Sequence, residues 1–206
     1  MKHEWRKSEK SIYLPKNKPA RVFVPKFNFF TIKGACNPND EIFGEYIGVL
    51  YSLSYAIKMS PKSGNAPENY FEYTVYPLEG VWDIKEEARA NCNGTINKDD
   101  LVFNLMIRQP NFVTIDYADE IIQKTKKKKP HRLLDEVKFE PIEDGDCIQM
   151  MHLGSYDDEP NSFKQMEEFA ENLNLKRLSK VHREIYLSDA RKTESNKLKT
   201  ILRFKV

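Results

Sequence analysis

The stretch from residue 152 to residue 160, HLGSYDDEP, holds several side-chain types that take part in binding or catalysis. The His152 imidazole can accept or donate a proton, and the Tyr156 phenol can donate a hydrogen bond to a developing negative charge. Three carboxylates and a proline follow. The stretch lies between an apolar run, CIQMM, and a segment with helical periodicity, SFKQMEEFAENL. It therefore either lines a site or forms an ordinary strand-to-helix connection in solvent.

A second group of reactive side chains lies further on, in the segment VHREIYLS. In a strand, alternation places His182, Glu184 and Tyr186 on one face. Ile185 and Leu187 lie on the other face and are suited to packing against helices. We therefore predict that the first three side chains face away from the helices, towards a groove. A carboxylate such as Glu184, lying in an apolar cleft within reach of water, can act as a general base.

The same alternation in FEYTVY places Glu72 on one face of a strand and Tyr73 on the opposite face. Glu72 and Glu184 would then lie early in two related strands. Either both carboxylates point towards a shared cleft, or both are exposed on a solvated sheet face beside basic neighbours.

Aromatic residues are concentrated in the first half of the chain. They include Tyr46, Tyr51, Tyr55, Tyr70, Tyr73, Tyr76 and Trp82. Aromatics at this density are typical of a hydrophobic core. Tyrosine and tryptophan also form walls that hold flat hydrophobic or cationic molecules, so both explanations apply to this group.

The elements that must position these side chains occur twice, in the order strand, helix, strand, strand. In the first half the expected elements are a strand over 21–34, a helix over 41–59, and strands over 71–80 and 101–109. In the second half they are a strand over 147–156, a helix from about Pro160, and strands over 181–188 and 198–206. Gly34 and Gly154 close the first strand of each repeat. The corner at 152–160 is then mostly architectural, because its carboxylates suit the amino-terminal end of a helix.

We predict an α+β fold in one domain over 1–206, with a first module at about 21–110 and a second at about 146–206. The modules are expected to be pseudo-twofold related, with an antiparallel sheet, helices on one face and a ligand cleft between them. The segment at about 111–145 is expected to hold a helix, a basic stop and a short strand. Its run KKKK is either a nucleic-acid or membrane patch or, as we favour, a solvated helix end stopped by Pro130.

Composition excludes several classes of protein. The 33 basic and 31 acidic residues give a net charge of +2, which does not favour nucleic acid as a partner. No apolar run is long enough to cross a membrane, and the start lacks the apolar core of a signal peptide, so we expect a cytoplasmic protein. Cys36, Cys92 and Cys147 are expected to be reduced. No phosphate-binding loop, nucleotide fingerprint or metal-ligand spacing is present, and we predict no cofactor and no metal ion.

The chain resembles the GyrI-like small-molecule-binding domain family, particularly its stand-alone bacterial members. The resemblance covers nearly the whole chain and rests on FEYTVYPLEGVWD, LMIRQP, HLGSYDDEP and HREIYLSDARK. It implies paired modules of the kind described above and a cleft for diverse flat hydrophobic or cationic compounds. It also implies a central glutamate, which here is Glu184. Some stand-alone members are similar to enzymes that open the cyclopropane ring of DNA-alkylating natural products with water.

The resemblance and the residue pattern together predict a drug-binding protein with hydrolase activity on cyclopropane compounds, protecting the cell. Glu184 is the expected general base, and Tyr156 or Tyr186 the expected donor to the oxygen that gains charge. The aromatic rings expected to stack on the ligand are those of Trp82, Tyr46 and Tyr73. His152 and Glu72 are further candidates for ligand contact. A non-catalytic multidrug-binding or effector-sensing module is the alternative function, and an inhibitor of another protein such as a topoisomerase is a third.

Overall fold

The structure is a computed structural model that describes residues 2–89 and 97–206. It divides the chain into two compact units. The first unit holds Phe27–Leu78 and Trp82–Ile142 together with the extreme amino terminus. The second holds Glu4–Lys26, Glu79–Val81 and Glu143–Val206.

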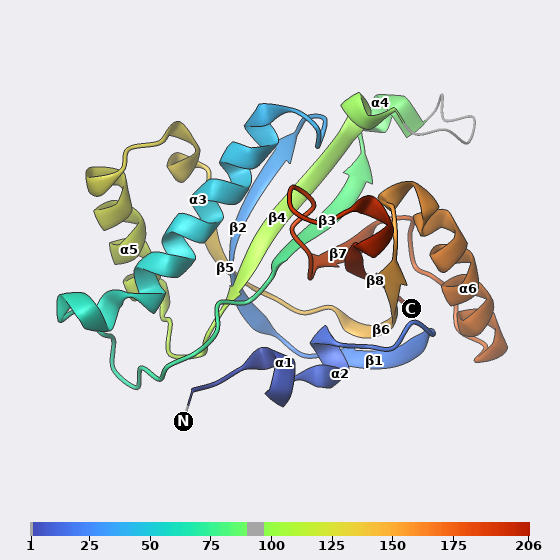
Figure 1. Cartoon of the computed structure of the whole chain (residues 1–206), viewed down its shortest axis with the longest axis horizontal. Helices are drawn as coiled ribbons and strands as arrows, with labels where there is room; N and C mark the ends of the chain where they lie inside the picture. The colour runs from blue at the N-terminus through green and yellow to red at the C-terminus, as the bar shows by residue number, and fades with distance from the viewer. Residues whose placement is uncertain (1, 90–96) are drawn as a thin grey trace. The chain divides into compact units, whose positions relative to one another are not determined.

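The first unit is an antiparallel sheet with helices packed on it (Figure 1). Its strands are β2 (Phe27–Ala35), β3 (Leu78–Ile84), β4 (Leu101–Gln109) and β5 (Lys138–Ile142), in the spatial order β3-β4-β2-β5. Its helices are α3 (Glu41–Lys58), α4 (Glu86–Arg89) and α5 (Ile115–Lys128), with short 3-10 turns η1 (Ser60–Ser63), η2 (Lys98–Asp100) and η3 (Arg132–Asp135). Helix α3, which confirms the helix predicted over 41–59, packs on β2 and β4 through the fully buried Leu50, Leu53 and Ile57.

The second unit has strands on which helices pack from both faces. Its strands are β1 (Ala20–Val24), β6 (Gly145–Leu153), β7 (His182–Tyr186) and β8 (Lys199–Lys205), in the order β1-β6-β8-β7. Its helices are α1 (Trp5–Ser8), α2 (Lys10–Tyr13) and α6 (Glu159–Asn172), with 3-10 turns η4 (Tyr156–Asp158) and η5 (Ser195–Lys197). Met166 and Ala170 of α6 pack against Met150, Leu202 and Phe204 of the strands.

The predicted repeat is confirmed by the topology of the two units. The chain order is β2-α3-β3-β4 in the first and β6-α6-β7-β8 in the second. In each unit the first strand of the repeat lies beside the last, and the last lies beside the second. The predicted α+β class with antiparallel strands is therefore correct.

Two predicted strand boundaries are wrong. The run over 21–34 is two strands, because Pro25 lacks an N–H for a continuous ladder, and β1 pairs with β6 in the second unit. The strand expected over 71–80 is displaced to β3, which starts after Pro77. Before that proline, the Glu72 carbonyl and the Thr74 N–H bond to the backbone of His3.

The segment between the repeats folds as predicted. It forms α5, whose last turn holds Lys126, Lys127 and Lys128, and then the short strand β5. Cys36 and Cys147 are free thiols, and Cys92 lies outside the described residues.

The guanidinium of Arg183, on β7, is buried in the second unit. Its Nη1 donates to Glu79 Oε2 at 2.9 Å, and its Nη2 and Nε contact the two carboxylate oxygens of Asp144 at 2.8 Å each. The Tyr13 hydroxyl donates to the other oxygen of Glu79 at 3.2 Å. These contacts compensate the loss of hydration that burial imposes on the charges.

A second guanidinium, that of Arg203 on β8, completes the network. It donates to the Gln149 side-chain carbonyl at 2.9 and 3.1 Å and to the Ile12 carbonyl at 3.0 Å, and its Nη1 lies 3.4 Å from Asp144. Burial alone would raise the pKa of Asp144, but Arg183 and Arg203 outweigh it and hold that pKa below its usual value. Two buried cations are thereby matched with two buried carboxylates, those of Glu79 and Asp144.

We predict that Glu79→Gln destabilises the protein by about 3 kcal/mol, because it leaves Arg183 with an uncompensated buried charge. Urea unfolding at pH 7 followed by circular dichroism measures this. The control is Glu194→Gln, which removes a carboxylate that is 70% exposed and should change the free energy of unfolding by less than about 0.5 kcal/mol. Equal midpoints for the two variants would contradict a structural role for the Glu79–Arg183 pair.

Candidate functional site

Strand β7 places Glu184 on the sheet face that α6 covers. Glu184 lies opposite Leu202 in the ladder, and Leu202 belongs to the core that α6 completes. His182, on the same face, packs its ring against Phe163 of α6 with centroids 4.7 Å apart. The prediction that these side chains face away from the helices was therefore wrong. The opposite face is occupied by Arg183, whose carboxylate partners lie there.

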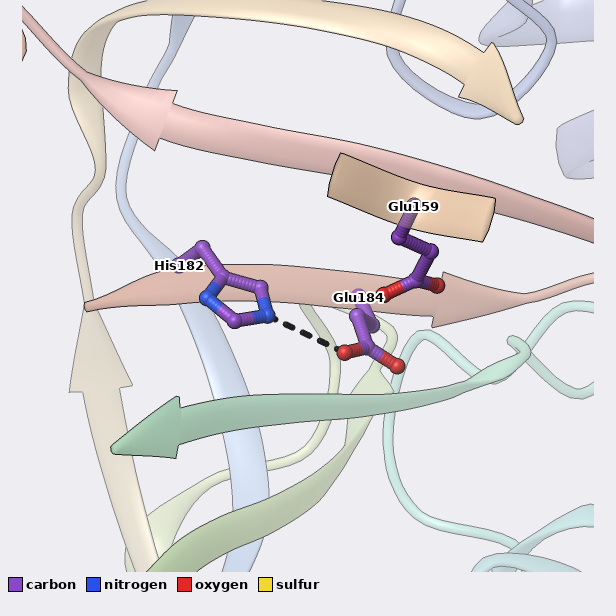
Figure 2. Close-up of side chains that lie close together, drawn as sticks. All are labelled: Glu159, His182 and Glu184. Atoms are coloured by element: carbon purple, nitrogen blue, oxygen red, sulfur yellow. Dashed lines mark hydrogen bonds and ion pairs between the residues drawn. The ribbon is translucent and has the colours of Figure 1, made fainter. Parts of the chain in front are cut away.

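Glu184 is only 8% exposed and has a close basic neighbour. The Nε2 atom of His182 lies 3.1 Å from Glu184 Oε1. Figure 2 marks this contact with a dashed line. This contact fixes the orientation of the Glu184 carboxylate.

A third carboxyl group, that of Glu159, joins this pair from the first turn of α6 (Figure 2). Single ligand atoms of Glu159, His182 and Glu184 all lie within 4.8 Å of one another. Glu159 is 7% exposed, and its Oε1 atom has no hydrogen-bond partner among the described residues. Burial, with the negative charges of Glu184 and Asp157, raises the pKa of Glu159 to about 10. Glu159 therefore holds a proton at neutral pH.

Two tyrosines stand beside the carboxyl pair. Tyr156 in η4 and Tyr186 at the end of β7 pack edge to face with centroids 6.2 Å apart. Burial, followed by the charges of Glu184 and Glu159, raises the pKa of Tyr156 to about 12, although a hydrogen bond with Thr200 opposes the shift. The Tyr156 phenol therefore stays protonated and can donate a hydrogen bond to an oxygen that gains charge.

His152 has an architectural position. It is 4% exposed, its Nδ1 lies 2.9 Å from the Ser162 hydroxyl, and its Nε2 lies 2.9 Å from the Ser155 carbonyl. These bonds tie the end of β6 to α6. The intervening Gly154 has φ +123°, a conformation that residues with a side chain rarely adopt. Both ring nitrogens of His152 are thus engaged within the corner.

Trp82 and Tyr46 are brought together in the first unit around Phe103. The ring of Tyr46 lies 5.2 Å from that of Phe103, and the ring of Trp82 lies 5.5 Å from it. Phe43 of α3 completes the cluster 5.8 Å from Trp82. A Cβ atom on Gly34 would lie 2.5 Å from Phe103, so glycine is needed where these rings approach β2.

Tyr73 and Glu72 lie apart from that cluster. Tyr73 is 1% exposed, packs against Phe112 and Tyr70, and its hydroxyl has no hydrogen-bond partner in the described part of the chain. Burial raises the pKa of Tyr73 well above its usual value. Glu72 is exposed, so Glu72 and Glu184 have different surroundings.

Sequence reasoning missed Glu79 and Glu159. Glu79 was missed because its strand was expected over 71–80, whereas β3 starts at Leu78. Glu159 was interpreted only as a helix-terminal charge, although a signal was present, because it precedes the apolar positions Phe163, Met166 and Ala170 at helical spacing. That spacing places Glu159 on the buried face of α6.

The duplicated α+β topology is that of a family of small-molecule-binding domains. The chain belongs to the GyrI-like small molecule binding domain family, whose profile matches residues 18–206. This confirms the resemblance on which the sequence interpretation relied.

Solved structures give the same assignment. The chain is similar to a hydrolase from Listeria innocua, with 34% identity, 98% of each chain covered and a TM-score of 0.88. It is also similar to a hydrolase encoded by lin2189 from the same organism, with 35% identity, 99% of this chain and 98% of that chain covered, and a TM-score of 0.89. The C-terminal domain of EcmrR shares the fold alone, at 12% identity, 92% and 98% coverage and a TM-score of 0.54.

A comparison with curated proteins gives no match. Within residues 2–89 and 97–206, every helix is too short or too polar to cross a membrane.

We predict that Glu159→Gln stabilises the protein at pH 8, by about 1–3 kcal/mol. The folded pKa of about 10 exceeds the unfolded value of about 4.3. The stability associated with protonated Glu159 is therefore complete below about pH 4 and is lost as the pH rises towards 10. Urea unfolding in chelator-containing buffer should show the advantage of the variant shrinking between pH 8 and pH 5.

The matched control is Glu168→Gln, which removes an exposed carboxylate from the same helix. Its stability relative to the wild type should not depend on pH. If Glu159→Gln behaves like this control, Glu159 is ionised in the folded protein and the description above is wrong.

Proposed function

We propose that this protein binds flat hydrophobic or cationic small molecules and hydrolyses electrophilic cyclopropane rings of DNA-alkylating compounds. The observation that carries the proposal is the burial of the Glu184 carboxylate beside His182 and a protonated Glu159. The hydrolases from Listeria innocua that resemble the chain over nearly its full length support a hydrolytic activity. Such an activity in the cytoplasm would protect the cell by destroying the compound before it reaches DNA.

The proposed reaction adds one water molecule to the ring. Glu184 takes a proton from water as the water oxygen attacks a ring carbon, and the strained carbon–carbon bond breaks. The electron pair of that bond passes through the conjugated system to a carbonyl oxygen, which becomes a phenolate. The Tyr156 phenol donates a hydrogen bond to this oxygen as its charge grows. A proton then returns to the oxygen, and the product is an alcohol and a phenol.

The side chains around Glu184 and Tyr156 have separate roles in this proposed reaction. His182 orients Glu184 through the 3.1 Å contact. Glu159 is a neutral acid next to Glu184, so the site holds one fewer negative charge and has a proton donor close by. Tyr186 supports the Tyr156 ring by its edge-to-face contact. Trp82 and Tyr46 are proposed to stack on a flat ligand within the first unit, whereas the buried Tyr73 ring packs in its core.

A second candidate function is a non-catalytic multidrug-binding or effector-sensing module. The carboxyl oxygens within 4.8 Å of each other favour it, because they attract a cationic ligand without any chemical step. Binding of a cationic aromatic dye without turnover of any cyclopropane compound would support this alternative.

We predict that Glu184→Gln slows ring opening at least about 100-fold, since an amide cannot accept the proton from water. Purified protein is incubated with a cyclopropane-bearing alkylating compound in chelator-containing buffer, and mass spectrometry follows the gain of one water. The control is Glu72→Gln, which removes an exposed carboxylate. Equal rates for wild type and Glu184→Gln would remove Glu184 from the mechanism, and absence of turnover in the wild type would favour the binding module.

Tyr156→Phe is expected to lower kcat about 10- to 100-fold while KM changes little, because the hydrogen bond strengthens as the oxygen gains charge. Tyr186→Phe is the matched control, because it keeps the edge-to-face ring contact and should reduce kcat less. A larger loss in Tyr186→Phe would reassign the donor role to Tyr186.

A further inference from the structure

The three side chains Glu159, His182 and Glu184 are the ligand types that bind first-row transition metals. One imidazole and two carboxylates offer ligand atoms that all lie within 4.8 Å of one another. Ligands bound to zinc at about 2.0–2.2 Å are themselves about 3–4 Å apart, so small side-chain rotations suffice. All three side chains belong to the second unit.

The hydrogen bonds of His182 give independent support. Its Nδ1 lies 3.3 Å from the Lys180 carbonyl, so the tautomer with its hydrogen on Nδ1 can donate there. In that tautomer the lone pair of Nε2 faces the Glu184 carboxylate at 3.1 Å. A metal ion between these two acceptors would make the contact favourable. An imidazole that donates from one nitrogen to a carbonyl and binds a metal with the other is the usual arrangement of a histidine ligand.

Glu159 supplies a second independent observation. Its carboxyl group is more than nine-tenths buried and points towards Glu184, and its Oε1 lacks a hydrogen-bond partner among the described residues (Figure 2). A buried polar atom without a partner costs free energy. A cation between the two carboxyl groups would displace the Glu159 proton and satisfy this atom.

We propose that Glu159, His182 and Glu184 form a binding site for a divalent first-row transition metal, for which Zn²⁺ is the best match. An imidazole ligand and a small donor set disfavour Mg²⁺ and Ca²⁺, which prefer six or more oxygen ligands. Three protein ligands leave a coordination position for water or a ligand oxygen, as in catalytic zinc sites. This metal site is not needed for the proposed ring opening, because that reaction is tested in chelator-containing buffer.

Isothermal titration of metal-free protein with ZnCl₂, in buffer containing millimolar Mg²⁺, tests the site. We expect one Zn²⁺ per chain at this site, and at least a tenfold weaker affinity in both His182→Gln and Glu159→Gln. The matched control is His131→Gln, because His131 is half-buried and also lies near a carboxylate, that of the exposed Glu45 at 3.6 Å. This control should bind Zn²⁺ as the wild type does.

A second measurement does not depend on the folding of the variants. Crystals of the wild-type protein soaked in ZnCl₂ should give an anomalous-scattering peak, at the zinc absorption edge, between the three side chains. No binding, binding unaffected by both substitutions, or a peak only elsewhere would overturn the proposal. No cyclopropane compound is present, so failure of the metal site and failure of the hydrolase proposal are separate results.

Discussion

The buried guanidinium of Arg183 sets the orientation of β7, and with it the position of Glu184. Arg183 must reach Glu79 and Asp144, and both lie on one side of the strand. Alternation then forces His182 and Glu184 to the opposite face, beneath α6. Turning the strand over would bury Arg183 without its partners and would cost more than the packing of one or two apolar side chains could return. A structural ion pair thus determines where the Glu184 carboxylate lies.

The α6 face is an unusual environment for that carboxylate. A helix amino terminus normally favours negative charge, as the sequence interpretation assumed for Glu159. Here the first turn of α6 lies against β7, so Glu159 loses the solvent that would stabilise its ionised form. Burial and the neighbouring Glu184 outweigh the helix dipole and raise the pKa of Glu159 to about 10. A protonated acid and a carboxylate therefore lie side by side. Residues with strongly perturbed pKa values of this kind cluster at functional sites.

Periodicity and helix-start signals predicted the repeat and its helices. The orientation of β7 depends instead on buried charges whose partners are distant in sequence. The repeat order, the apolar face with Leu50 and Leu53, and the start of α6 near Pro160 follow from periodicity and from helix-start signals. The face of β7 could not be predicted, because Ile185 and Leu187 suggested the wrong side and the partners of Arg183 lie far away in sequence. Glu72 was wrongly expected to lie in a strand, because strand periodicity does not locate a strand start next to a proline. The family resemblance pointed to Glu184, but it did not predict that this carboxylate is buried beneath α6.

The two repeats share one topology but place different side chains where the helix meets the sheet. In each unit the first turn of the helix meets the second strand of the repeat. In the first unit this contact joins Phe43 to Trp82 and is entirely aromatic. In the second unit it joins Glu159 to Glu184, and neither side chain gains apolar packing from the other. Because the topology is the same, the fold does not require carboxylates at this point. The pair in the second unit is therefore explained by the proposed chemistry rather than by the fold.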